Sequence, residues 1–182
     1  DRVHCELAWS PDTVKWHRID EGNPLIPLAD QRGEYDWGCA YAAASPLVLP
    51  DGNIQIYYGA SNGRHTSWRD GFLALASLRP DGWAGFEPVD RSSPGSLSTS
   101  LLKCSGDLLR ITADAAGGSV TAIALDQAGN RLARSAPLSG SLTAAPVPWR
   151  NEFSLARLAG QAVRLQFMLQ NAKLYSFKFD SR

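Results

Sequence analysis

The chain has 182 residues, of which 44% are hydrophobic, so it can bury a core in one large domain or in two small ones. Its 18 Lys and Arg residues balance its 18 Asp and Glu residues, and no basic run stands out. We therefore expect neither a nucleic-acid partner nor an anionic membrane surface as a partner. No segment approaches the roughly 20 consecutive apolar residues of a membrane-spanning helix.

The cysteines Cys5, Cys39 and Cys104 are odd in number and show no CxxC spacing. This usage disfavours a metal site or a disulfide framework, and we expect no metal and no cofactor. Buried free thiols are the simpler interpretation, and a Cys5–Cys39 disulfide is the alternative if their strands are neighbours. The chain begins at Asp1 without a Met and enters a strand almost at once. We therefore expect a piece of a longer protein or a processed product.

The first half reads as a series of short antiparallel strands. Alternating apolar and polar residues predict strands at 3–9 and 14–19. A central hairpin follows, with an apolar strand at 47–49, turn chemistry at 50–53 and an alternating strand at 54–58. A further strand is predicted at residues 72–78, and a short aromatic strand or edge at residues 83–87 follows a Pro-Asp-Gly turn.

The polar segment 91–96, rich in Ser, Pro and Gly, is the expected boundary between a domain at 1–90 and a domain at 97–182. Turns are expected at residues 117–118 and 127–130, and one helical turn is expected at 153–160 with Ser154 as N-cap. The remaining segments between turn signals are predicted as strands: 98–103, 108–113, 119–126, 163–169 and 174–179. Short strands at this spacing predict an all-β fold with a β-sandwich in the second half.

Three segments of the first half place an Asp-containing turn before a strand: SPDTVKW, LPDGNIQIYY and SLRPDGWAGF. This recurring pattern, although no strict repeat, fits the sequential antiparallel meanders of β-propeller blades. The ordered segments ELAWSPDTVKWHRI, EYDWGCAYAAASPLVLPDGNIQIYYGASNGRH and GFLALASLRPDGWAGFEP resemble the last blades of five-bladed β-propellers related to glycoside hydrolase family 32. The later segment RLQFMLQNAKLYSFKF is similar to the β-sandwich that follows such propellers.

This resemblance implies a carbohydrate-associated fragment with a partial propeller followed by a sandwich, and it implies an extracellular or periplasmic location. The catalytic motifs of the family are not matched. The chain has no Asn-Asp-Pro and no Arg-Asp-Pro motif, because Arg69-Asp70 is followed by Gly71. Cys5-Glu6 has the reverse order of the family's Glu-Cys motif. No member of the catalytic set is therefore carried over to this chain.

A candidate ligand site flanks the central hairpin within residues 33–71. Aromatic rings can stack on the apolar face of a sugar, while carboxylate, guanidinium and imidazole groups can hydrogen-bond its hydroxyls. The residues expected to bind a ligand are Asp36, Trp37, Tyr41, His65, Trp68, Arg69 and Asp70. The competing interpretation of Trp37 and Trp68 is that they pack in a core between blades.

The leading hypothesis is a glycan-binding fragment of a glycosidase-like protein without a complete catalytic set. The first alternative is an active glycoside hydrolase, whose two carboxyl groups would be Asp36 and Asp70. The second alternative is a structural or assembly β module. Because a propeller closes on itself to hide its strand edges, we expect the sandwich or a second copy of the chain to cover residues 1–90, the latter as a homo-oligomer.

Overall fold

The computed structural model describes residues 1–181 and confirms that the chain is all-β. Its contacts divide the chain into two compact units, residues 1–84 and residues 85–182. The division lies before the polar segment 91–96, and strand β7 (Gly95–Ser98) begins inside that segment. Among the described residues, no helix is long and apolar enough to cross a membrane.

The N-terminal unit is built on a central strand that pairs antiparallel on both sides. Strand β5 pairs with β6 along one edge, and along the other edge with β4 and then β3, which lie end to end. Strands β1 and β2 form a separate antiparallel pair. The bounds of these strands are β1 (Leu7–Trp9), β2 (His17–Ile19), β3 (Cys39–Ala42), β4 (Leu47–Val48), β5 (Ile54–Ser61) and β6 (Gly71–Leu78).

The predicted turn of the central hairpin is confirmed. The Leu49 amide donates to the Asn53 carbonyl at 2.8 Å, and the Gly52 amide donates to the Leu49 carbonyl at 2.9 Å. Gly52 has a φ of 84°, which a residue without a Cβ adopts freely. The Asp51 carboxylate accepts the Asn53 amide at 3.0 Å, and this bond lowers the pKa of Asp51. Local turn chemistry thus sets the register of β4 and β5.

The sheet of the N-terminal unit has one covered face and one exposed face. Ile54, Ile56 and Tyr58 of β5 are buried against Ile26, which comes from the long segment before β3. Because successive side chains of a strand point to opposite faces, the residues of β5 between these buried ones lie on the other side of the sheet. That side is apolar and open to solvent, and its members are Tyr41, Leu47, Tyr57, Leu73 and Leu75.

The C-terminal unit holds the longest strand, β9 (Leu108–Leu125), and its remaining strands pair with it directly or through β12. The bounds of the other elements are β7 (Gly95–Ser98), β8 (Leu102–Lys103), β10 (Arg131–Arg134), β11 (Leu138–Pro146), β12 (Ala162–Gln170), β13 (Lys173–Asp180) and the 3₁₀ helix η1 (Leu155–Leu158). The helical turn predicted at 153–160 is confirmed, because the Ser154 hydroxyl accepts the Ala156 amide at 3.2 Å as an N-cap. The sheet is curled into a half-barrel.

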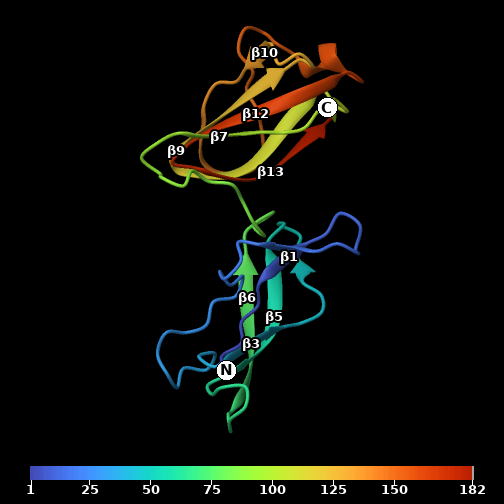
Figure 1. The fold of residues 1–182 in the computed structure, drawn as a ribbon. Coiled ribbons are helices and arrows are strands. Elements are labelled where there is room, and N and C mark those ends of the chain that lie inside the picture. The colour runs from blue at the N-terminus through green and yellow to red at the C-terminus, as the bar shows by residue number, and fades with distance from the viewer. Residues whose placement is uncertain (182) are drawn as a thin grey trace. The chain divides into compact units, whose positions relative to one another are not determined.

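Strand β9 serves both halves of the curled sheet (Figure 1). Its first part pairs with β13, and its second part pairs with β12 and β10. The turn predicted at residues 117–118 is wrong, because the strand continues through Gly117 and Gly118. A Cβ at Gly118 would lie 1.8 Å from the Gln170 carbonyl oxygen. The two glycines therefore let the strand bend tightly against the turn between β12 and β13, without reversing the chain.

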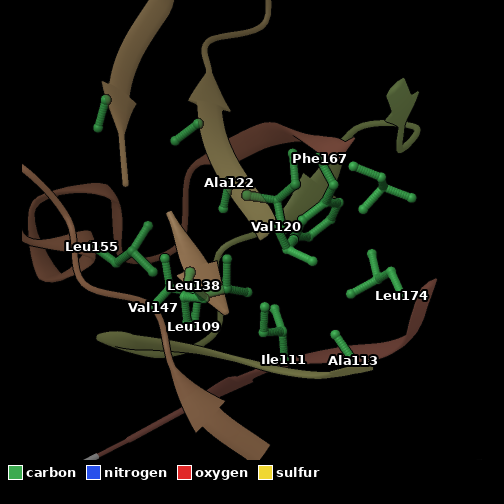
Figure 2. Packing of buried hydrophobic residues seen from close by; sticks show 14 of the residues in the cluster. Leu109, Ile111, Ala113, Val120, Ala122, Leu138, Val147, Leu155, Phe167 and Leu174 are labelled. Carbon is green, nitrogen blue, oxygen red and sulfur yellow. The ribbon is translucent and has the colours of Figure 1, made fainter. Parts of the chain in front are cut away.

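The residues of β9 that point into the core are odd-numbered before this bend and even-numbered after it. Residues 109, 111, 113 and 115 are buried before the glycines, and residues 120, 122 and 124 are buried after them. Figure 2 shows the five labelled members, residues 109, 111, 113, 120 and 122, gathered with Phe167, Leu138 and Leu174 from the neighbouring strands. The bend thereby turns one strand into two walls of a single hydrophobic core, and Leu155 of η1 adds a fully buried side chain to it.

Candidate functional site

A groove of about 460 Å³ lies in the N-terminal unit between two loops. One loop precedes β3 and the other joins β5 to β6. The loops meet because β3 and β5 are antiparallel, with Cys39 opposite Ser61. The start of β3 and the end of β5 therefore lie at the same end of the sheet. The lining residues are Arg32, Gly33, Trp37, Asn62, Gly63, Arg64, Ser67, Trp68, Arg69 and Asp70.

Close backbone contact fixes the two loops to each other. The Gly38 amide donates to the Ser61 carbonyl at 2.8 Å. A Cβ at Gly38 would lie 1.8 Å from the Gly63 carbonyl oxygen, so only glycine allows this approach. That carbonyl also accepts the Ser61 hydroxyl at 3.0 Å. Short backbone contacts therefore fix the position of Gly63, which lines the groove.

The two tryptophans of the groove lie in different environments. Trp68 is 94% exposed, so its ring is free to contact a ligand. Trp37 is partly buried, and the guanidinium carbons of Arg2 and Arg32 lie 4.9 and 5.8 Å from its ring centroid. Arg2 also donates to the Trp37 carbonyl at 2.7 Å. Cation–π contacts thus hold Trp37 in the wall, while Trp68 projects from the rim.

Hydrogen bonds order the loop between β5 and β6. The Asn62 amide group donates to the Asp70 carboxylate at 2.9 Å, and the Asp70 backbone amide donates back to Asn62 at 3.0 Å. Nη1 of Arg69 donates to the His65 carbonyl, and it also lies 3.4 Å from the Ser67 carbonyl oxygen. Asn62, Arg69 and Asp70 are therefore presented at fixed positions on a closed loop.

Four of the seven predicted site residues, Trp37, Trp68, Arg69 and Asp70, line this groove. Tyr41 and His65 instead pair with each other, with the Tyr41 hydroxyl 2.6 Å from His65 Nδ1, and neither lines the groove. Arg32, Asn62 and Arg64 also line the groove and are not among the seven predicted residues. A strand at 39–42, paired with the predicted strand 54–58 extended to Ser61, would have placed their loops at the same end of the sheet.

Asp36 lies apart from the lining residues. It is 7% exposed, and the Tyr58 hydroxyl donates to its carboxylate at 3.0 Å. The Tyr35 hydroxyl lies 3.3 Å from that of Tyr58. Burial, followed by the hydrogen bonds to Tyr35 and Asp36, raises the pKa of Tyr58. Tyr58 is therefore a neutral donor that holds a buried carboxyl group in place.

Replacing Tyr58 with phenylalanine is expected to reduce the free energy of unfolding by about 1–3 kcal/mol, because it leaves the buried Asp36 carboxyl without this donor. Urea denaturation measures the loss. Tyr57→Phe is the matched control, since Tyr57 is 42% exposed on the opposite face of the same strand. Equal losses in the two variants would contradict the structural role of the Tyr58 hydroxyl.

The carboxylate of Glu6 lies beside the β1–β2 pair and is bonded to side chains there. His4 Nε2 lies 3.0 Å from its Oε1, and Nη2 of Arg18 lies 2.5 Å from its Oε2. The hydrogen bonds from His4 and then Arg18 lower the pKa of Glu6 to about 2. A carboxyl group with such a pKa is ionised at neutral pH, so Glu6 is unsuited to act as a general acid.

All three cysteines are free, so the alternative of a Cys5–Cys39 disulfide is wrong. The Cys5 thiol instead donates to the Ala40 carbonyl at 3.3 Å and accepts the Ala42 amide at 3.2 Å.

Comparison of the chain with known protein families, with curated proteins and with solved structures finds no match to any of them.

Proposed function

We propose that the N-terminal unit binds carbohydrate in the groove between the loop before β3 and the loop from β5 to β6. The observation that carries this proposal is the 94% exposure of Trp68 at the rim of a groove lined with hydrogen-bonding side chains. A bare indole ring in water exposes a large apolar face, and the C–H face of a sugar ring can cover it. Asn62, Arg69 and Asp70 stand beside it as donors and acceptors for hydroxyl groups.

Binding is favoured over hydrolysis by the carboxylates of the groove. Most glycoside hydrolases use two carboxyl groups that flank the scissile bond. Asp70 is the one carboxylate among the described residues that line the groove, and Asn62 already donates to it. Asp36, its suggested partner in catalysis, is buried against Tyr58. A carbohydrate-binding site needs no second carboxylate.

We also propose the finer architecture that the family resemblance implies, with residues 1–84 as part of a β-propeller and the C-terminal unit as a β-sandwich. The antiparallel meander of β3 to β6, with one apolar face open to solvent, supports the first part. The two core walls that β9 forms on either side of its bend support the second part. A structure of the protein in its native assembly in which no further sheet packs on this open face would contradict the propeller assignment.

A glycan array with the purified chain tests the binding proposal. We expect saturable binding to at least one glycan, and we expect Trp68→Ala to weaken it about tenfold, as loss of one stacking contact does. Trp16→Ala is the matched control, because Trp16 is 60% exposed and lies outside the groove. Binding to no glycan, or equal weakening by the two variants, would overturn the proposal.

A further inference from the structure

A second cavity, of about 650 Å³ and open to solvent, lies at the surface of the C-terminal unit. One wall is strand β10, and the other is the segment that leads into and includes η1. The Arg150 amide donates to the Arg134 carbonyl at 3.1 Å, and a β-bridge joins Ser135 to Trp149, so the two walls are held together by backbone. The lining residues are Arg131, Leu132, Ala133, Arg134, Arg150, Asn151, Phe153 and Arg157.

Half of these lining residues are arginines, and no carboxylate is among them. In the described part of the chain, none of the four forms an ion pair, whereas Arg18, Arg91 and Arg110 each pair with an acidic side chain. Glu152 belongs to the same segment but does not line the cavity. The four side chains are exposed, so water weakens their mutual repulsion, and an anion placed among them would meet four cationic donors without a competing carboxylate in the lining.

The chemistry of the lining points to an anionic ligand of small size. A guanidinium group donates two parallel hydrogen bonds to a carboxylate, a phosphate or a sulfate, and such bonds are stronger than neutral ones. Phe153 adds an apolar surface to the cavity, and its ring is held by edge-to-face contact with Trp149 at 5.4 Å between centroids. The volume lies in the range that small organic ligands occupy.

We propose that this cavity binds a small organic molecule that carries two or more phosphate, sulfate or carboxylate groups. The four arginines supply the charge and the paired donors, and Phe153 contacts the carbon skeleton between the anionic groups. The proposal is independent of carbohydrate binding in the N-terminal unit. No residue is shared between the two sites, so one can fail without the other.

Isothermal titration calorimetry with three probes tests the proposal: inorganic tripolyphosphate, citrate and sucrose octasulfate. We expect saturable binding of at least one probe at a single site, and the probe bound most tightly identifies the anionic group. The variant Arg134→Gln/Arg150→Gln is expected to weaken that binding at least tenfold. Its thermal unfolding without a probe is expected at the same temperature as wild type or higher, because two repelling charges are removed.

The control variant Lys15→Gln/Lys103→Gln removes the same charge from two exposed residues that do not line the cavity. It is expected to bind the probes as wild type does, and so is Trp68→Ala in the groove of the N-terminal unit. Equal weakening by the two charge variants would show attraction to net charge only and would overturn the proposal. Failure of all three probes to saturate, or tighter binding of duplex DNA than of any of them, would overturn it as well.

Discussion

Replacing Gly118 with alanine is expected to lower the free energy of unfolding of the C-terminal unit by roughly 3 kcal/mol, near the upper end for an overpacked site. The added Cβ would lie 1.8 Å from the Gln170 carbonyl oxygen and 2.7 Å from that of Asn171. Both are backbone atoms at the turn between β12 and β13, so neither can rotate away. Asn171, at a φ of 42°, is further fixed by its side-chain bond to the Gly117 carbonyl at 2.9 Å.

Native-state hydrogen exchange in urea measures this loss, because peptides from residues 108–125 report on the C-terminal unit alone. Gly59→Ala is the control for alanine at an uncrowded strand glycine, since a Cβ there meets no atom within 4 Å, and its effect is read from peptides of its own strand, β5 (Ile54–Ser61). Gly117→Ala supplies an intermediate case, because its Cβ would meet the movable amide of Asn171. If Gly118→Ala were as stable as the Gly59→Ala variant, the close approach of the turn to β9 would be wrong.

Truncation of Phe167 to alanine is expected to cost the same unit roughly 3–5 kcal/mol, the range for a large aromatic side chain in a packed core. Phe167 is 0% exposed in the centre of β12 (Figure 2). Its ring centroid lies 5.3 Å from that of Phe177. The cavity left behind cannot collapse easily, because strands that share β9 surround it. The cost would therefore include both lost burial and an unfilled void.

Phe86→Ala makes the same chemical change in the same unit at a side chain that is 70% exposed, and its effect should stay within about 0.5 kcal/mol. Chemical denaturation followed by circular dichroism compares the two variants. Similar midpoints for Phe167→Ala and Phe86→Ala would show that the core is not centred on β12.

The sequence predicted those elements that local chemistry determines. The hairpin turn at 50–53 and the Ser154 cap depend on residues within a few positions of each other, and both are present. Strand β11 was missed because its sequence, LSGSLTAAP, is rich in Ser, Gly and Ala and only partly buried. The Gly-Gly pair in β9 predicts a turn and not a bend, although such a pair is typical of both. Only its contact with residue 170, far along the chain, decides between them.

The same distinction applies to the candidate site. Trp68, Arg69 and Asp70 were predicted because they cluster in the sequence, and they do share the groove. Asp36 belongs to the same predicted set but does not line the groove, because its carboxylate is buried against the Tyr58 hydroxyl. The arginines of the C-terminal cavity lie up to 26 positions apart, at residues 131 and 157, so no spacing rule groups them. The pairing of distant segments brings such sites together, and it is the least local property of the fold.

The two-part role of β9 also has a consequence for how the C-terminal unit is made. Its first residues pair with the strand at 173–180, so Leu108 lies opposite Asp180, and Arg110 bonds to Asp180 across 70 positions. As the chain leaves the ribosome, the apolar face of β9 has no complete partner until that last strand has emerged. Pairing over such a separation is slow, because the intervening loop must close first. The nascent unit would therefore expose its future core for most of its synthesis, and this is the period in which a chaperone would be most useful to it.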